Sequence, residues 1–357
     1  MPGTKPLLAI LVIGILFSSC SSGTSQTTVL SRVSGATPGS GEVVWRYSTG
    51  GWVRSTPVAY KEQLLFGSLA GYFNAVNIGT GEVIWEYKTR GRFSGSPAIS
   101  GKTAFIGSTD RNLYAFDLEM GEKKWSFLTG GRIFATPAVE GGNLFVGSLD
   151  GFLYCLSTKS GREKWRFATN NGISATPAIE GGTVYCGSWD GYLYALGKGD
   201  GKLKWRFKTG NLVLSSPAVK NNTVCFGSAD GTFYALNAGD GKLKWQFETR
   251  DQIVSSPAIA NNTVFFSGKD GILYALDLKT GREKWRHELE EPIDSSPVVE
   301  KGVVYFGGVD GTLYALDAGS GSAIWQYRTE GRIFSAPLVN EGVVYFGSKD
   351  GYVYAVR

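Results

Sequence analysis

The chain has 357 residues, and 50 of them are glycine, about twice the share of ~7% that is usual in globular proteins. It is 42% hydrophobic and 19% charged, a composition that supports a large core and excludes a disordered chain. The net charge of +5 is spread without basic blocks, which excludes nucleic acid as a partner, and the one histidine, His287, excludes most metal-site and triad chemistry.

The first residues are typical of a targeting signal. Lys5 precedes an apolar run over residues 6–17, and small residues then lead to Cys20. This pattern predicts a signal peptide over residues 1–19, and the run is too short to span a bilayer comfortably. The small residues ending in cysteine resemble a bacterial lipobox, which implies lipidation of Cys20. The alternative is ordinary secretion with Cys20 merely nearby.

The residues that follow Cys20 are polar and cannot form a core. We therefore expect residues 20–40 to hold the lipidated cysteine and a flexible tether. No aspartate stands directly after Cys20. In a Gram-negative cell, the sorting rule for lipoproteins then implies the outer membrane, on its periplasmic face.

The rest of the chain is one unit repeated eight times with a period of 40 residues. Glycine recurs from Gly41 to Gly321 and proline from Pro57 to Pro337, always at this spacing. Tryptophan marks the same period at Trp45, Trp85, Trp125, Trp165, Trp205, Trp245, Trp285 and Trp325.

One unit contains four short runs of β-branched and aromatic residues. They cover residues 253–259, 263–266, 272–276 and 283–287, and turn signals separate them. Asn261-Asn262 and Asp270-Gly271 predict tight hairpin turns that need positive φ, and residues 278–281 predict a longer turn. Four antiparallel strands in 40 residues are typical of a propeller blade. Proline is expected inside the innermost strand, whose inner edge faces a central channel and has no partner.

The two ends of the chain each contain an incomplete unit. The chain ends in a third strand with no fourth strand after it, and residues 42–47 form a fourth strand with no blade before it. These two pieces complete one blade, which also hides a sheet edge. We therefore predict an all-β fold, an eight-bladed propeller of four-stranded antiparallel blades over residues 41–357, whose last blade is closed by the N-terminal strand.

The segment from Ala275 to Trp285 resembles the tryptophan-docking motif of pyrroloquinoline quinone (PQQ)-type propellers. That motif has Ala, Asp or Asn, Gly and Trp at these spacings, and the similarity runs over residues 41–357. The resemblance implies that each repeated tryptophan packs between neighbouring blades. It is specific for the fold and nearly silent on function.

Two groups of proteins share this motif. Quinoprotein dehydrogenases commonly stack PQQ on adjacent half-cystines, whereas this shorter chain has no adjacent cysteines. BamB lipoproteins of the outer-membrane β-barrel assembly machinery are eight-bladed, lipid-anchored and non-catalytic. The resemblance to BamB implies a protein-binding scaffold of the cell envelope, monomeric within a larger complex, with no cofactor and no metal. A quinoprotein dehydrogenase or a propeller that binds a small ligand remains the alternative.

Three cysteines lie within the repeats. Cys155 replaces the alanine of the repeat, and Cys186 and Cys225 occupy apolar positions of second strands. We expect buried free thiols. Because Cys186 and Cys225 belong to neighbouring blades, a disulfide between them remains open.

Functional residues are expected where the repeats differ. The loops between blades and the turns between second and third strands share one face, and arginines and a tryptophan gather there on contiguous blades. This pattern is typical of an interface hot spot, and ordinary solvated loop charge is the alternative. The basic arc consists of Arg332, Trp52, Arg54, Arg90, Arg92 and Arg132, and acidic residues are expected across the ring at Asp251, Glu288, Glu290, Glu291 and Asp294.

Three other residues are candidates for protein contacts on this face. Trp189 stands at a variable place before Asp190-Gly191, and either an exposed aromatic or packing over a neighbouring loop fits it. Leu212 and Leu214 put apolar side chains on a loop that leads into a blade. In the BamB family, loops of this kind contact the barrel-forming partner.

The remaining polar patterns favour structural roles. His287 stands where other repeats have tyrosine or phenylalanine, so we expect it to fill an aromatic slot, with a catalytic base as the alternative. The repeated Asp-Gly pairs fit hairpin turns better than a metal cage. Glu290 and Glu291 have no ligand spacing that supports a cation site.

Overall fold

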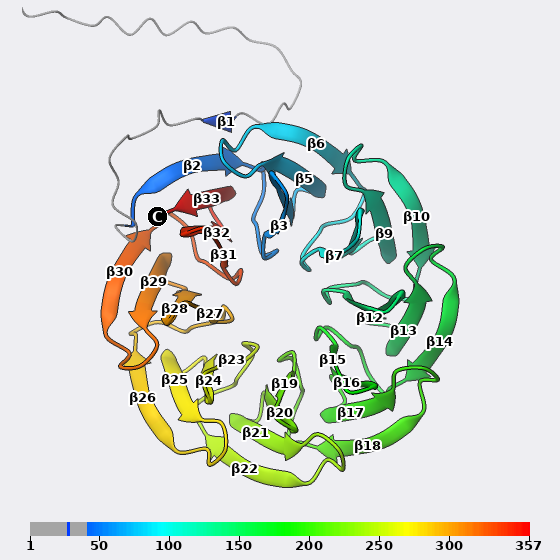
Figure 1. Ribbon diagram of the computed structural model, residues 1–357, viewed down its shortest axis with the longest axis vertical. Helices are drawn as coiled ribbons and strands as arrows, with labels where there is room; N and C mark the ends of the chain where they lie inside the picture. The colour runs from blue at the N-terminus through cyan, green and yellow to red at the C-terminus, as the bar shows by residue number, and fades with distance from the viewer. Residues whose placement is uncertain (1–26, 29–40) are drawn as a thin grey trace, which may run out of the picture.

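The computed structural model describes residues 27–28 and 41–357 and forms a ring of eight blades (Figure 1). All regular structure in the described residues is β-strand. The expected signal peptide and Cys20 lie outside the described residues. In the described part of the chain, no helix has the length and apolarity that a membrane span requires.

The innermost strand of every blade is only three residues long. In this position lie β3 (Val58–Tyr60), β7 (Ala98–Ser100), β11 (Ala138–Glu140), β15 (Ala178–Glu180), β19 (Ala218–Lys220), β23 (Ala258–Ala260), β27 (Val298–Glu300) and β31 (Leu338–Asn340).

The second strands are buried over most of their length. They are β4 (Gln63–Gly67), β8 (Thr103–Gly107), β12 (Asn143–Gly147), β16 (Thr183–Gly187), β20 (Thr223–Gly227), β24 (Thr263–Ser267), β28 (Val303–Gly307) and β32 (Val343–Gly347).

The third strands are buried along nearly their whole length. They are β5 (Tyr72–Asn77), β9 (Asn112–Asp117), β13 (Phe152–Ser157), β17 (Tyr192–Gly197), β21 (Thr232–Asn237), β25 (Ile272–Asp277), β29 (Thr312–Asp317) and β33 (Tyr352–Val356).

The outermost strands form the rim of the ring in Figure 1. They are β2 (Val43–Ser48), β6 (Val83–Lys88), β10 (Lys123–Leu128), β14 (Glu163–Ala168), β18 (Leu203–Lys208), β22 (Leu243–Glu248), β26 (Glu283–Glu288) and β30 (Ala323–Arg328). Blades 1 to 7 follow in chain order from β3–β6 to β27–β30, and blade 8 contains β31, β32, β33 and β2.

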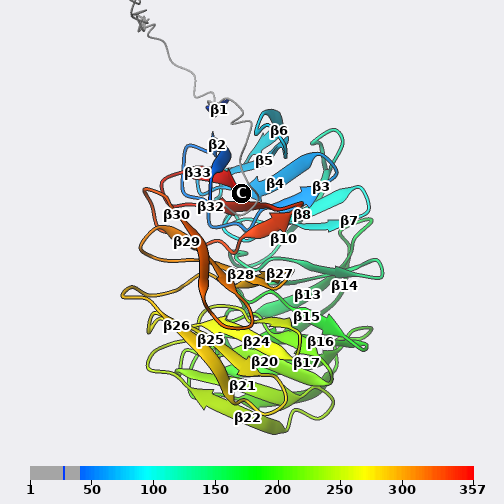
Figure 2. The ribbon, with the colours of Figure 1, turned by 60° about the vertical axis from the view of Figure 1, so that its left-hand side comes forward.

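The ring closes as the sequence predicts, through antiparallel pairing of β2 with β33 in blade 8. The amide of Glu42 donates to the carbonyl of Arg357 at 3.0 Å, and the amide of Arg357 donates back to Glu42 at 2.9 Å. A fifth strand, β1 (Thr27–Thr28), pairs with β2 on the outside of this blade, within the range expected to be tether. β1, β2 and β33 lie together in both views (Figures 1 and 2).

The expectation that proline lies inside the innermost strand is wrong. Pro257 stands directly before β23, and the five residues that precede β23 make no strand. A side chain takes the place of backbone pairing here, because the Ser255 hydroxyl donates to the carbonyl of Ser267 at 2.7 Å and accepts from its amide at 2.9 Å. Because Pro257 lies outside the strand, its missing N–H group does not remove a hydrogen bond between strands.

The predicted turns are confirmed with one correction. Asn261 and Asn262 have φ of 45° and 57°, and Gly271 has φ of 79°. Asp270 does not adopt positive φ and caps the turn with its carboxylate instead, since Oδ1 accepts the amide of Ile272 at 3.2 Å. Asp270 therefore acts through its side chain rather than through a special backbone conformation.

The hydrophobic core lies between blades rather than in one centre. One cluster joins Phe105 and Leu113 of blade 2 to Leu144 and Val146 of blade 3, and similar clusters follow around the ring. The repeated tryptophans seal these junctions from outside. Seven indole N–H groups, from Trp45 to Trp285, donate to a carbonyl of the next blade, such as Ile78 at 3.0 Å.

Candidate functional site

One face of the ring is built from two kinds of connection that touch each other. Loops that lead from an outermost strand to the next innermost strand lie against the turns between second and third strands. The amide of Thr109 in such a turn donates to the carbonyl of Arg92 at 3.0 Å, and the amide of Arg92 donates to the Thr109 hydroxyl at 2.8 Å. We call this side the loop face, and it is the face that the sequence predicts.

A three-residue pattern of glycine, variable residue and apolar residue places the arginines on the loop face. A Cβ at Gly91 would lie 2.4 Å from the amide nitrogen of Asp110, so only glycine allows the loop to press on the turn. Phe93 is fully buried two residues later. Arg92, between them, is exposed. The same pattern presents Arg132, Arg332 and Trp52.

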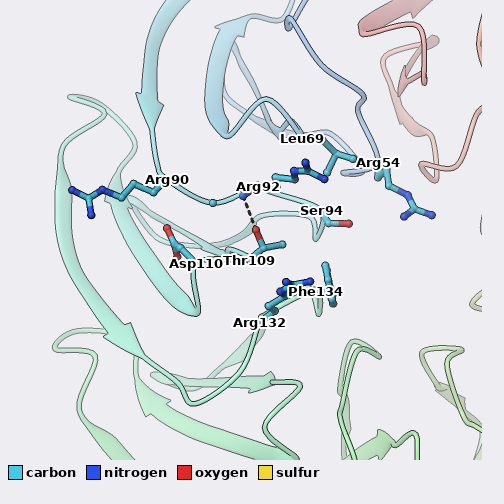
Figure 3. Close-up of a pocket in the computed structure, with 10 residues that line it drawn as sticks. Arg54, Leu69, Arg90, Arg92, Ser94, Thr109, Asp110, Arg132 and Phe134 are labelled. Atoms are coloured by element: carbon cyan, nitrogen blue, oxygen red, sulfur yellow. Dashed lines mark hydrogen bonds between the residues drawn. The ribbon is translucent and has the colours of Figure 1, made fainter.

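Four arginines of blades 1 to 3 surround one cavity, which we call the arginine cavity (Figure 3). Its volume is about 480 Å³. Figure 3 shows Arg90 at one end and Arg54 at the other, with Arg92 and Arg132 between them. The lining consists of Arg54, Leu69, Arg90, Gly91, Arg92, Ser94, Thr109, Asp110, Arg132 and Phe134.

The positive charge of this cavity has no acidic partner among the described residues. None of the ion pairs in that part of the chain includes Arg54, Arg90, Arg92 or Arg132, and none of these four guanidinium groups donates a hydrogen bond there. The one carboxylate on the wall, Asp110, accepts from the Tyr114 hydroxyl at 2.8 Å and from a backbone amide. The cavity can therefore bind an anion through charge-assisted hydrogen bonds.

The apolar and hydroxyl groups of the cavity are not among the contact residues that the sequence predicts. Leu69 and Phe134 supply apolar wall, and Ser94 and Thr109 supply hydroxyl groups. Each of these four residues stands at a position where the repeats differ. Variation between repeats therefore indicates the positions that line the cavity. Periodicity alone does not say which of those side chains face one another.

Trp52 lies on the same face but does not line the arginine cavity. Its side chain is 47% exposed, and the ammonium of Lys349 lies 3.9 Å from its ring centroid. Arg54 makes a similar contact with Phe334, 4.9 Å from the centroid. These cation–π pairs hold both side chains in place on the loop face.

The other predicted contact residues lie elsewhere on the ring. Trp189 of blade 4 is partly buried, and its indole donates to the Ser174 hydroxyl at 2.8 Å, so it packs over a neighbouring loop. Leu212 and Leu214 of blade 5 are also partly buried. The structure does not bring these three residues together with the arginines.

The mouth of the central channel is a second cavity of about 400 Å³ on the same face. Asp294, Lys269 and Phe334 line it, and it shares Arg54 and Ser94 with the arginine cavity. The Oδ1 atom of Asp294 is buried and has no hydrogen-bond partner among the described residues. The channel mouth is therefore charged and polar rather than an apolar slot.

Three of the five predicted acidic residues line a third cavity, of about 570 Å³, which lies over blade 7 between the loops that join it to blades 6 and 8. Glu288, Glu290 and Glu291 line it together with Arg328 and Arg332. Arg332 thus lies beside the acidic residues, because blades 7 and 8 are neighbours in the ring. The face is polarised between blades 1 to 3 and blade 7, and Arg332 belongs to the acidic side of that division.

His287 and the three cysteines of the repeats lie within the packing of the blades. The ring of His287 lies 6.4 Å from that of Phe306 and 6.2 Å from that of Tyr314, and burial lowers the pKa of His287. Cys155, Cys186 and Cys225 are buried and free, and burial raises the pKa of Cys155 to about 11. Within the described ranges, no cluster of three or more His, Cys, Asp or Glu side chains is placed to hold a metal ion.

Two protein-family models match parts of this chain. A family model described as "Beta-alanine-activating enzyme, beta-propeller" matches residues 175–357, which is more than half of the chain. The chain belongs to this β-propeller family. A second model, described as "Outer membrane protein assembly factor BamB", matches residues 30–135. The chain is thus a PQQ-like repeat propeller that resembles BamB.

Solved structures agree with this family assignment at the level of the fold. BamB from Moraxella catarrhalis superposes with a TM-score of 0.78 at 21% sequence identity, covering 88% of this chain and 99% of that one. The computationally designed Ika8 protein also superposes with a TM-score of 0.78, at 18% identity, covering 87% of this chain and 98% of the designed chain. A comparison with curated proteins finds no match. At these identities, the likeness shows the propeller fold alone.

Proposed function

We propose that the protein is a non-catalytic scaffold, anchored by lipid at Cys20, that binds a protein partner in outer-membrane β-barrel assembly. The arginine cavity carries this proposal, because four guanidinium groups without an acidic partner among the described residues form a preorganised surface for an acidic partner. The BamB model match and the shared fold support the cellular role. The periplasmic face of the outer membrane is the expected location.

The arrangement of side chains also supports binding rather than catalysis. His287 sits in an aromatic slot with a lowered pKa, and the aspartates of the turns are occupied by tyrosine hydroxyl and backbone amide groups. In the described residues, the loop face stands on a closed ring of hydrogen-bonded blades, so a partner meets a fixed surface. The function is then rigid presentation of the loop face.

Isolation of the partner from membranes tests this proposal. Cells expressing the tagged full chain are crosslinked mildly, their membranes are solubilised, and co-purified proteins are identified by mass spectrometry. We expect an outer-membrane barrel protein with periplasmic domains. Arg92→Glu combined with Arg132→Glu should reduce its recovery about tenfold or more, since each charge-assisted hydrogen bond contributes roughly 1.5–3 kcal/mol.

A matched variant controls for charge and folding. Arg282 is exposed in a turn on the opposite face, so Arg282→Glu changes charge without touching the loop face and should leave recovery unchanged. Equal recovery with the double variant would contradict the assignment of the interface. Recovery of no envelope protein, together with binding of PQQ and Ca²⁺, would favour the quinoprotein alternative.

A further inference from the structure

The arginine cavity and the channel mouth form one continuous surface. They share Arg54 and Ser94, so the two hollows meet at the inner end of the arginine cavity. Together they extend from the outer part of the loop face to the axis of the ring.

The arginines are arranged along this surface by their distance from the axis. Each loop runs from an outermost strand inward, so residues earlier in the loop lie nearer the rim. Arg90 stands seven residues before Pro97, Arg92 five before it, and Arg54 three before Pro57. Figure 3 shows the same order, with Arg90 and Arg54 at opposite ends. Positive charge thus follows a radial line.

The length of this line suits a short piece of extended chain. Four strands of a blade lie ~4.8 Å apart, so the path from outermost to innermost strand is roughly 14 Å. An extended peptide rises ~3.3 Å per residue and covers that path with about four residues. Two of its side chains, at alternate positions, would then face the arginines.

Two apolar side chains stand on the walls of the arginine cavity, beside the hydroxyl groups of Ser94 and Thr109. Leu69 of blade 1 and Phe134 of blade 3 both line the arginine cavity, and Phe334 lies at the channel mouth. Inorganic phosphate or a phosphorylated headgroup would use the guanidinium groups and leave these side chains unmatched. A peptide whose carboxylates alternate with apolar side chains would use both kinds of group.

We propose that this radial groove binds an extended acidic peptide segment of the partner, in which Asp or Glu alternates with apolar residues. The inference rests on the proposed function, because it names the chemistry that the loop face recognises in that partner. The guanidinium groups bind the carboxylates, and Leu69 and Phe134 contact the apolar side chains. The channel mouth receives the end of the segment beside Arg54 and Lys269.

Fluorescence anisotropy with the purified protein tests this inference. The probe is a labelled heptapeptide, Asp-Leu-Glu-Leu-Asp-Leu-Glu, and the control probe replaces each acid by its amide. We expect saturable binding of the acidic peptide, weakened by added salt, and about tenfold or more weaker binding of the amide peptide. Equal binding of the two peptides would overturn the inference.

Two variants locate the binding to the groove. Arg92→Glu with Arg132→Glu should weaken binding of the acidic peptide about tenfold or more. Arg250 stands seven residues before Pro257, the position that Arg90 has before Pro97, but lies outside the groove. Arg250→Glu should therefore change the affinity less than about twofold. Equal loss in both proteins would show diffuse attraction to the whole face and contradict the groove.

Inorganic pyrophosphate serves as the competing ligand. If it binds saturably and the acidic peptide does not, the site recognises phosphate and the peptide inference is wrong. If neither peptide binds but Arg92→Glu with Arg132→Glu still abolishes recovery of the envelope partner, this inference fails and the proposed function stands. If the acidic peptide binds and no envelope partner is recovered, the proposed function fails instead.

Discussion

An aspartate in the loop-face turn of blade 3 organises three surrounding groups. Asp150 accepts the Tyr154 hydroxyl at 2.9 Å, the Phe152 amide at 3.0 Å and the amide of Gly130 at 2.7 Å from the adjacent loop. The same Asp–Tyr bond recurs in blades 2 to 8. In blade 1 both partners change together, to Ala70 and Asn74. A residue chosen for a turn thus also fixes the surface on which the arginines stand.

The tyrosines that donate to the turn aspartates should make the fold less stable at alkaline pH. Burial, and then the carboxylate of Asp310, raise the pKa of Tyr314 to about 12, above the value of ~10 in an unfolded chain. A raised pKa stabilises the fold fully below pH ~10, and this contribution is lost as pH rises through 10 toward 12. Calorimetry should show a Tm that is steady from pH 7 to 9 and falls above pH 10.

A conservative variant isolates this effect. Tyr314→Phe removes the titrating hydroxyl and should cost about 1 kcal/mol at pH 7, because one partly buried hydrogen bond is lost. Its Tm should then fall less steeply above pH 10 than that of the parent protein. Parallel curves for the two proteins would show that the tyrosines do not cause the alkaline loss.

At the scale of elements, the blades are joined by a tryptophan and a glycine from consecutive repeats. Trp85 of blade 1 donates its indole N–H to the carbonyl of Leu118 in blade 2 at 3.3 Å. Gly121, in the same turn of blade 2, has φ of +69° and lies directly against the indole ring of Trp85. The repeat spacing of 40 residues therefore reflects a contact between blades as well as the length of one blade.

Replacement of this glycine tests the junction. A Cβ at Gly121 would lie 2.6 Å from Cγ of Trp85, whereas a Cβ at Gly101, with φ of +59°, would meet nothing within 4 Å. Both alanine variants carry the strain of positive φ, and only Gly121→Ala adds the clash. Denaturant unfolding should show Gly121→Ala less stable than Gly101→Ala by about 1–3 kcal/mol. Equal free energies of unfolding for the two variants would mean that the Trp85 side chain moves aside without loss of stability.

The sequence predicts those strands and turns well whose residue types recur in every repeat. The tryptophan register, the hairpin asparagines and the split last blade all follow from strict spacing and turn chemistry. The innermost strand is shorter than predicted because Ser255 bonds to Ser267 across the blade, a contact that no local pattern reveals. The arginines could be predicted from their variation between repeats. Their apolar neighbours Leu69 and Phe134 could not, because the direction of a loop side chain depends on packing.

At the scale of the whole molecule, closure of the ring makes the loop face rigid. β2 joins β33 at the far end of the chain, and within β2 Trp45 and Tyr47 are almost completely buried. A cation–π pair of the loop face crosses this seam, since Trp52 follows β2 and Lys349 precedes β33. The geometry of the proposed interface therefore depends on the two ends of the propeller remaining paired.

Removal of the closing strand should weaken the entire ring. A chain that begins at Thr49 lacks β2 and exposes the edge of β33, so we expect a Tm lower by at least ~10 °C, or aggregation through the free edge. A chain that begins at Gly41 keeps β2 and serves as the control. Similar Tm values for the two chains would show that blade 8 is stable without its outermost strand.

Site-specific photocrosslinking in cells tests the central claim, that the loop face binds the partner through its arginines. A photoreactive amino acid is placed at Trp52 on the loop face or at Met120, which is 69% exposed in a turn on the opposite face. We expect a crosslinked envelope protein from position 52 and none from position 120. Arg92→Glu with Arg132→Glu should abolish the crosslink, and Arg282→Glu should not. A crosslink from position 120 alone, or one from position 52 that survives the arginine variants, would contradict the account.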